Sequence, residues 1–172
     1  MGEMLVKTFA NGITLLNLIF GSLSIMATIN ANYKLAAVFI LAAVIMDFMD
    51  GRVARKLDTI SDFGKELDSL CDLVSFGVAP AILLFAQLIG GINSALSLLA
   101  VLLFIACGAW RLARFNILNI SEHFVGIPIT MAGALLAVVS LLGDYISMFL
   151  ILIIMTVLSV LMVSNLRIKK IK

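Results

Sequence analysis

Seven of the ten carboxylates of this chain fall in one short stretch, between Asp47 and Asp72, while the rest of the sequence is strongly apolar. Asp47 and Asp50 are three residues apart, and the pair Asp68 and Asp72 is four apart. In a helix, either spacing places both acids on one face. Acids at the ends of apolar helices are costly unless a bound cation neutralises them. The spacing therefore predicts a cation site formed by two helix ends.

The donor atoms indicate the kind of cation. An all-carboxylate cluster suits a hard divalent ion such as Mg²⁺ or Mn²⁺, and it lacks the imidazole and thiolate ligands typical of zinc. Mg²⁺ is usually held by one or two carboxylates together with substrate phosphates. Gly51 leaves room for a substrate beside the backbone, and Arg55, one turn later, can pair with a phosphate. We therefore expect a phosphate-bearing substrate. The other acids of the stretch are expected to cap helices or pair with basic neighbours: Asp58, Asp62 and Glu66.

The elements that position these acids follow from the composition. Apolar residues make up 63% of the chain and the mean hydropathy is +1.19, which excludes an ordinary soluble domain. Each of six apolar stretches is long enough, or nearly so, to cross ~30 Å of hydrocarbon as a helix. The stretches are 13–31, 35–50, 70–90, 95–112, 128–143 and 146–164. We predict an all-α polytopic membrane protein with six transmembrane helices, in a single domain over residues 1–172. Residues 1–12 predict a short amphipathic segment on the membrane interface.

The basic residues predict the orientation. Eleven of the twelve lysines and arginines fall on one side of a six-span chain, and only Lys34 falls on the other. By the positive-inside rule, both termini and the acidic stretch are then cytoplasmic. The net charge of +2 reports this topology. We expect no nucleic-acid partner, because no basic patch is interleaved with aromatic residues.

The acids, glycines and one arginine also form a pattern: Asp-x-x-Asp-Gly-x-x-Ala-Arg over 47–55, eight residues, then Gly-x-x-x-Asp-x-x-x-Asp over 64–72. This pattern resembles the signature of the CDP-alcohol phosphotransferase family, with no position missing. The resemblance implies a six-helix membrane core that is usually dimeric. It also implies transfer of a phosphatidyl-type group from a CDP-linked lipid to an alcohol, with release of CMP.

The resemblance implies a role for each residue of the pattern. Two divalent cations, Mg²⁺ or Mn²⁺, would be held on the pyrophosphate by Asp47, Asp50, Asp68 and Asp72. Asp72 would also be the general base that takes the proton of the acceptor hydroxyl. The positions that match CDP contacts in the family are Gly51, Arg55 and Ser61, together with the Asn-x-x-Thr element of Asn11 and Thr14.

Three further segments resemble the branch of the family whose acceptor is L-serine. They are 75–81, 111–116 and 124–129, and the run 14–17 in the first apolar stretch also suits this branch. Thr130 departs from the branch, in which a second proline often stands at that place. We therefore expect L-serine as the acceptor, and a CDP-linked lipid with either diacylglycerol or archaeol tails as the donor, because any apolar groove serves both.

Serine needs a partner for its carboxylate. Arg111 and Arg114 are three residues apart and share a helix face, so one could bind this carboxylate and the other a donor phosphate. The alternative is that both only anchor the end of a membrane helix. Asn116, Asn119 and Glu122 are candidates for binding the serine ammonium group.

Two other functions compete with this interpretation. Glycerol 3-phosphate or inositol phosphate could be the acceptor, although a phosphorylated acceptor should require more cationic residues in the pocket. A divalent-cation transporter could use the four aspartates as its permeation site. The one-sided placement of the acids argues against a transporter, whose ligands should lie near the bilayer midplane.

Overall fold

The computed structural model describes the backbone of residues 2–56, 61–88, 94–118, 123–143, 145–164 and 167–169, and all structural statements below refer to these residues. Their side chains are described over 11–52, 61–87, 95–117, 126–143 and 145–164. The helices are α1 (Gly2–Ile29), α2 (Tyr33–Lys56), α3 (Asp62–Asp72), the π-helix η1 (Leu73–Val78), α4 (Ala79–Leu88), α5 (Ser94–Leu118), α6 (Ile129–Leu141) and α7 (Met148–Val163). Two short strands are β1 (His123–Val125) and β2 (Arg167–Lys169).

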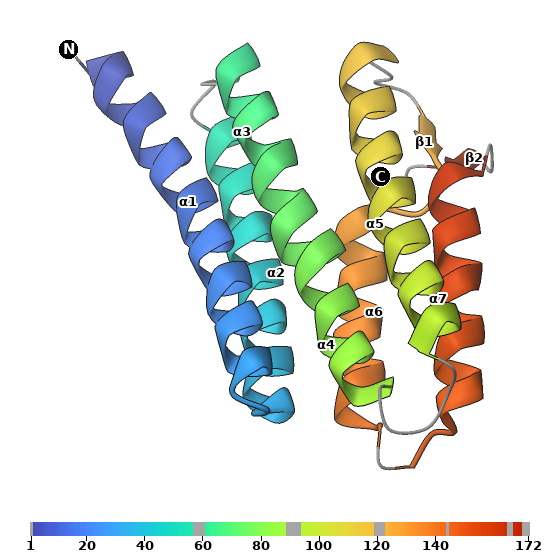
Figure 1. Cartoon of the computed structure of the whole chain (residues 1–172). Helices are drawn as coiled ribbons and strands as arrows, with labels where there is room; N and C mark the ends of the chain where they lie inside the picture. Colours follow the sequence, from blue (N-terminus) through green and yellow to red (C-terminus); the bar gives the residue numbers. More distant parts are fainter. Residues whose placement is uncertain are drawn as a thin grey trace.

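The helices form rods that correspond to the six apolar stretches, because α3, η1 and α4 continue into one another (Figure 1). Three helices are long and apolar enough to cross a membrane: Asn11–Ile29, Asp62–Gln87 and Ala95–Ile117. The helices α6 and α7 are apolar but shorter. The prediction of an all-helical polytopic membrane fold is confirmed, whereas the number of six spans stays a prediction.

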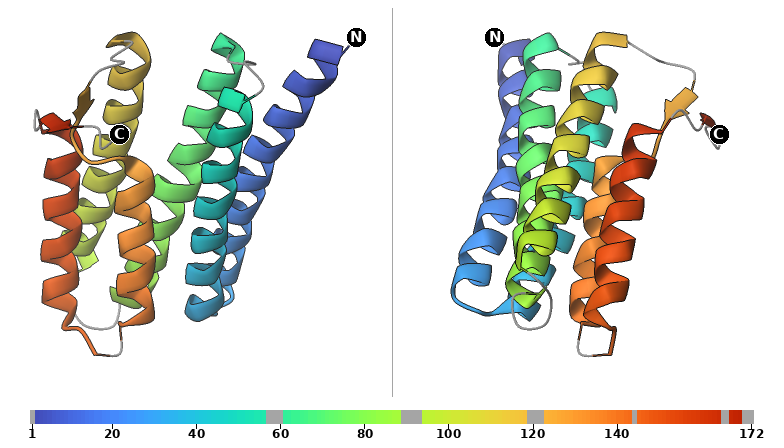
Figure 2. Two further views of the ribbon diagram at one scale, coloured as in Figure 1. Left: turned by 180° about the vertical axis from the view of Figure 1, so that it is seen from behind. Right: turned by 45° about the vertical axis from the view of Figure 1, so that its right-hand side comes forward.

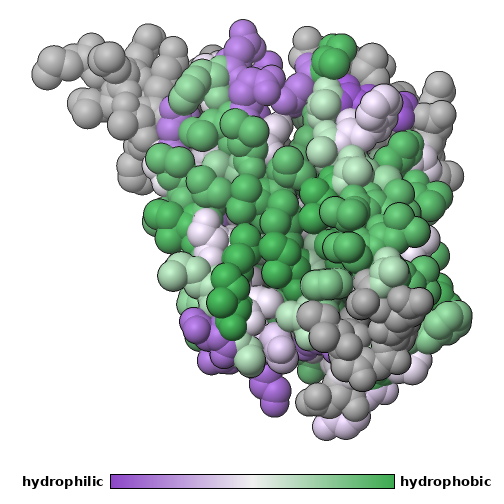
Figure 3. All heavy atoms as spheres, in the orientation of Figure 1, coloured by the Kyte–Doolittle hydropathy of each residue, from purple (hydrophilic) through white to green (hydrophobic). Residues whose placement is uncertain are grey.

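All rods run side by side, and Figure 2 shows the same arrangement from two further directions. The start of α1, the start of α3 and the C-terminal ends of α2 and α5 lie at one end of the bundle, together with the two strands. We call this the acidic end. In Figure 3, hydrophobic side chains cover the middle of the visible face, and hydrophilic ones gather toward the two ends of the rods. This distribution suits a bundle whose middle is surrounded by lipid.

The helix ends follow local sequence signals. Ser61 caps α3, because its side chain accepts a hydrogen bond from the backbone N–H of Gly64 at 3.0 Å. The third rod therefore begins at Asp62, well before the apolar stretch predicted from residue 70, and Asp68 lies inside the helix. Residues 2–12 belong to the same unbroken helix as the first apolar stretch. The place of this segment on a membrane interface stays a prediction.

Close helix packing depends on small residues around η1. A Cβ added to Gly133 of α6 would lie 2.7 Å from the Cα of Phe76, which is itself fully buried. A Cβ on Gly21 of α1 would lie 2.7 Å from the Cα of Ser75. These two contacts bring α1 and α6 against η1, as expected where small residues let helices approach closely in lipid. The core of the bundle is therefore centred on the segment directly after Asp72.

The two strands form an antiparallel pair that the sequence did not predict, with His123 opposite Lys169 and Val125 opposite Arg167. Gly126 follows β1 with a positive φ of 75°, a conformation that favours glycine. The next residue, Ile127, donates its N–H to the carbonyl of Leu161 in α7 at 3.3 Å. The chain entering α6 is thereby attached to the C-terminal end of α7.

Candidate active site

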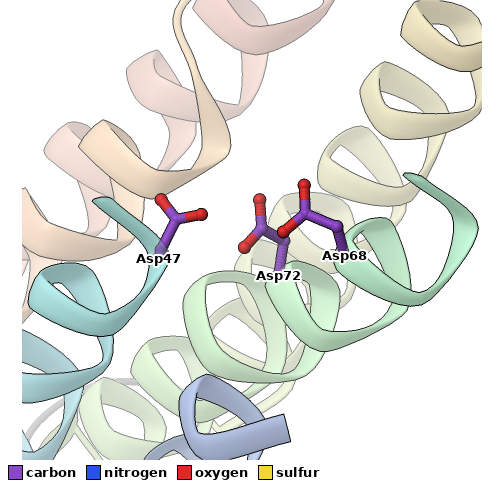
Figure 4. Close-up of side chains that lie close together, drawn as sticks. All are labelled: Asp47, Asp68 and Asp72. Atoms are coloured by element: carbon purple, nitrogen blue, oxygen red, sulfur yellow. The ribbon is translucent and has the colours of Figure 1, made fainter. Parts of the chain in front are cut away.

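Three carboxylates from two rods meet near the acidic end. Asp47 comes from α2, whereas Asp68 and Asp72 come from α3, and one oxygen of each lies within 4.8 Å of the others. Figure 4 shows the three side chains turned toward a common space between the two helices. Asp47 and Asp68 are partly buried, and Asp72 is only 7% exposed. Like charges this close in apolar surroundings repel one another, so the cluster favours a bound cation, and its all-oxygen donors suit Mg²⁺ or Mn²⁺.

Asp50 lies apart from this group of three. Its carboxylate is buried, with 7% exposure, and it accepts a hydrogen bond from the hydroxyl of Thr14 in α1. Asp50 still lies close enough to Asp68 for their charges to interact. The four predicted metal ligands thus occupy one region, but only three of them offer oxygens to a shared point. Thr14, predicted to contact CDP, is bonded to a carboxylate in this structure.

Asn17 is a site residue that the sequence interpretation missed. Its side chain is fully buried in α1, and its Nδ2 donates a hydrogen bond to Oδ1 of Asp72 at 3.1 Å. The signal that could have identified it is an amide inside an apolar stretch, because intramembrane polar residues are expensive and usually functional.

The two predicted anion-binding arginines have different environments. Arg111 is partly buried, its positive charge interacts with Asp72, and its buried Nε has no hydrogen-bond partner among the described residues. Arg114 instead donates from Nη1 to the backbone carbonyl of Val163, at the end of α7, at 3.4 Å. Of these two arginines, Arg111 is the one whose charge interacts with that of a clustered carboxylate, and the hydrogen bond of Arg114 joins α5 to α7.

Asn116 connects α5 to α3. Its Nδ2 donates to Oγ of Ser69 at 3.1 Å and to Oε1 of Glu66 at 3.2 Å. An ammonium group needs an acceptor, and Oδ1 of Asn116 already accepts a hydrogen bond from the hydroxyl of Ser69 at 3.3 Å, so the predicted role in binding the serine ammonium group must compete with this contact. The other two ammonium candidates, Asn119 and Glu122, lie outside the described residues.

Only some of the residues predicted to contact CDP lie close together among the described residues. A Cβ added to Gly64 would lie 3.1 Å from Oγ of Ser61 and 3.5 Å from Oδ1 of Asn11, so these three residues lie together at the start of α3. Gly51 is exposed on α2, directly after Asp50. The side chain of Arg55 lies outside the described ones.

Thr130 stands where the serine-accepting branch often has a second proline, and it has a partner in the structure. It lies in the first turn of α6, and its side chain hydrogen-bonds the carboxylate of Asp47. A proline at this place has neither a hydroxyl nor an N–H and could not make this bond. The α6 helix therefore supports one of the three clustered acids.

The bundle and its site define a polytopic membrane protein with a cluster of three carboxylates near one end of its helices. Residues 7–164 match the model of a family described as CDP-alcohol phosphatidyltransferase, and the chain belongs to this family.

Curated relatives extend the comparison. The chain is 47% identical over 133 residues to a CDP-diacylglycerol–serine O-phosphatidyltransferase of Methanocaldococcus jannaschii, which covers 77% of this chain and 60% of the relative. It is 40% identical over 129 residues to the enzyme of the same name from Bacillus subtilis, covering 74% and 72%. It is 39% identical over 156 residues to an archaetidylserine synthase of Methanothermobacter thermautotrophicus, covering 89% and 66%. The matched region thus spans 60% to 72% of these relatives' own lengths.

Proposed function

We propose that the chain transfers a phosphatidyl or archaetidyl group from a CDP-linked lipid to the hydroxyl of L-serine and releases CMP. The observation that carries the proposal is the cluster of Asp47, Asp68 and Asp72, which stand at the positions of the family pattern and lie within reach of one ion. The names of the three relatives described above support serine as the acceptor.

The three clustered acids, together with Asp50, are the residues that would hold two divalent cations, Mg²⁺ or Mn²⁺. Bound there, such ions neutralise the donor's pyrophosphate and stabilise the departing CMP. The chain's own part is to fix the acids: Thr14 bonds Asp50, Asn17 bonds Asp72 and Thr130 bonds Asp47. Three different helix contacts thus hold the carboxylates of α2 and α3.

Asp72 is the proposed general base. The serine hydroxyl oxygen forms a bond to the lipid-bearing phosphorus of the donor, and the bond between this phosphorus and the oxygen of CMP breaks. The proton of the hydroxyl passes to a carboxylate oxygen of Asp72 and later to solvent, while CMP leaves with the electron pair. The burial of Asp72 keeps competing water away from this carboxylate.

Arg111 is the proposed partner of the serine carboxylate. Its positive charge interacts with that of Asp72, and its buried Nε has no hydrogen-bond partner among the described residues, so a carboxylate placed there would satisfy this donor. The proposed contacts for the CDP portion of the donor are Asn11, Thr14, Gly51, Arg55 and Ser61. Of these, Asn11 and Ser61 both lie near Gly64 at the start of α3.

The experiment that tests the function is CMP release by the purified protein, with a panel of alcohols and both lipid donors. We expect release with L-serine, and little with glycerol 3-phosphate or inositol phosphate. If glycerol 3-phosphate drives release instead, the serine assignment is wrong while the transferase class stands. If no alcohol drives release with either donor, the proposed reaction is wrong.

The proposed setting is the cell membrane, with both termini and the acidic end on the cytoplasmic side and a homodimer as the assembly. A cysteine-accessibility assay tests the orientation. We expect reagents to reach cysteines placed in 56–66, 116–122 and 168–172 from the cytoplasmic face, and cysteines in 91–93 from the opposite face. Labelling of 56–66 from outside would contradict both the orientation and the six-span count.

A further inference from the structure

Helix α1 bonds one carboxylate from each of the two acidic helices. Thr14 donates to Asp50 of α2, and Asn17 donates to Asp72 of α3. Thr14 and Asn17 are three residues apart, so they lie on one face of α1. A helix that contributes none of the clustered acids is thus in direct contact with both helices that do.

Asn17 destabilises the fold at its position. An amide in a helix interior has a lower helix propensity than an apolar residue, and the side chain is fully buried. Its Oδ1 has no hydrogen-bond partner among the described residues, so burial of this oxygen costs free energy. The orientation of the amide is nonetheless determined, because only the NH₂ group can face a carboxylate. The single strong contact that offsets this cost is the bond to Asp72.

The backbone around Asn17 is held as well as its side chain. Ser75 of η1 is fully buried and donates its hydroxyl to the backbone carbonyl of Asn17 at 3.0 Å. One turn later, Gly21 lets α1 approach the backbone of Ser75. Because η1 begins directly after Asp72, these contacts fix the position of Asn17 relative to the carboxylate that it bonds.

We propose that Asn17 is a positioning residue, which holds Oδ1 of Asp72 and thereby directs the other oxygen of this carboxylate toward the divalent cation and the serine hydroxyl. Among the described residues, Asn17 gives the only hydrogen bond to Asp72. Without it, the carboxylate can rotate away from the two other acids. This inference rests on the proposed function, since it concerns the residue assigned there as metal ligand and base.

The test uses Asn17→Leu, which keeps roughly the volume of the side chain but removes the donor, and Asn17→Asp, which replaces the donor by an acceptor. Thr28→Val is the matched control, because Thr28 is also a buried polar residue of α1 and its hydroxyl bonds only the carbonyl of Ser24 in the same helix. Two quantities are measured for each purified full chain: Mn²⁺ binding, by the electron paramagnetic resonance signal of free Mn²⁺, and the kinetics of CMP release.

Loss of a hydrogen bond to a ligating carboxylate typically costs about 10–100-fold in metal affinity or activity. We therefore expect both Asn17 variants to bind Mn²⁺ about 10–100-fold more weakly and to lose kcat by a similar factor. The KM for serine should change less than kcat, because Asn17 does not contact the proposed carboxylate site. Thr28→Val should match the wild type in both measurements.

The outcomes separate this inference from the proposed function. If the wild type releases CMP with serine but Asn17→Leu binds Mn²⁺ and turns over like Thr28→Val, Asn17 has no positioning role and the proposed function stands. If the wild type neither binds Mn²⁺ nor releases CMP, the proposed function itself fails. If Asn17→Leu does not fold, Asn17→Asp, which has nearly the shape of the native side chain, carries the test with the same criteria.

Discussion

Replacing Asp68 by Asn should reduce CMP release by about three orders of magnitude or more, with little change in the stability of the bundle. An oxygen of Asp68 is within 4.8 Å of those of Asp47 and Asp72, and its charge also interacts with that of Asp50. An amide at this place keeps the shape but removes one of the negative charges that hold divalent ions. A loss of several kcal/mol of transition-state stabilisation corresponds to about a thousandfold in rate.

The control for this variant is Asp62→Asn, on the same helix. Asp62 is fully exposed and forms only a surface ion pair with Lys65 at 3.5 Å. Such a pair contributes little free energy, so Asp62→Asn should retain nearly full activity. Chelation should reproduce the loss in the wild type, with EDTA abolishing CMP release and added Mg²⁺ or Mn²⁺ restoring it. Full turnover in EDTA, or a fully active Asp68→Asn variant, would show that the acids do not hold a required cation.

Replacing Arg111 by Ala should raise the KM for serine by roughly ten- to a hundredfold, and should raise the KM for the CDP-lipid much less. The physical reason is the loss of a charge-assisted hydrogen bond to a poorly solvated carboxylate, which is worth ~1.5–3 kcal/mol. Arg111→Lys should restore only part of the affinity, because an ammonium group lacks the two-pronged geometry of guanidinium. Steady-state kinetics of CMP release, with each substrate varied in turn, measure both constants.

Arg52→Ala is the matched control for this arginine. Its guanidinium is also near the acidic helices but lies over the ring of Phe48, 4.1 Å from the ring centre. We expect this variant to keep the KM for serine within about twofold, since a single exposed cation–π contact contributes only ~0.5–1 kcal/mol and does not involve the substrate. Arg114→Ala should instead lower the thermal stability, because Arg114 joins α5 to the end of α7. A wild-type KM for serine in Arg111→Ala would rule out the proposed carboxylate contact.

The class of protein and its family could both be inferred from the sequence, because both depend on local patterns. A helix that crosses hydrocarbon needs a long apolar run, and this requirement can be read segment by segment. The motif is a set of residue types at fixed separations, so the spacing of Asp47, Asp50, Asp68 and Asp72 was sufficient to indicate the family. The expectation of a divalent cation came from the donor atoms alone, and it stays a prediction.

The sequence did not reveal which of these residues meet; the folded bundle shows it. Which acids share a point depends on the rotation of each helix about its axis, and this rotation is determined by packing contacts such as Gly21 against Ser75. The π-helix directly after Asp72 has a similar effect on α4, because its wider turn shifts the faces of the residues that follow it relative to a regular α-helix.

The same reason explains why Arg114 bonds the end of α7 and why Asn17 bonds Asp72. Helical spacing placed the two arginines on one face, but it could not tell which neighbour each would meet. Asn17 and Asp72 are 55 residues apart in the chain and are brought together by the packing of α1 against α3 and η1. Contacts of this kind depend on how the helices pack against one another, so residue spacing within one helix cannot predict them.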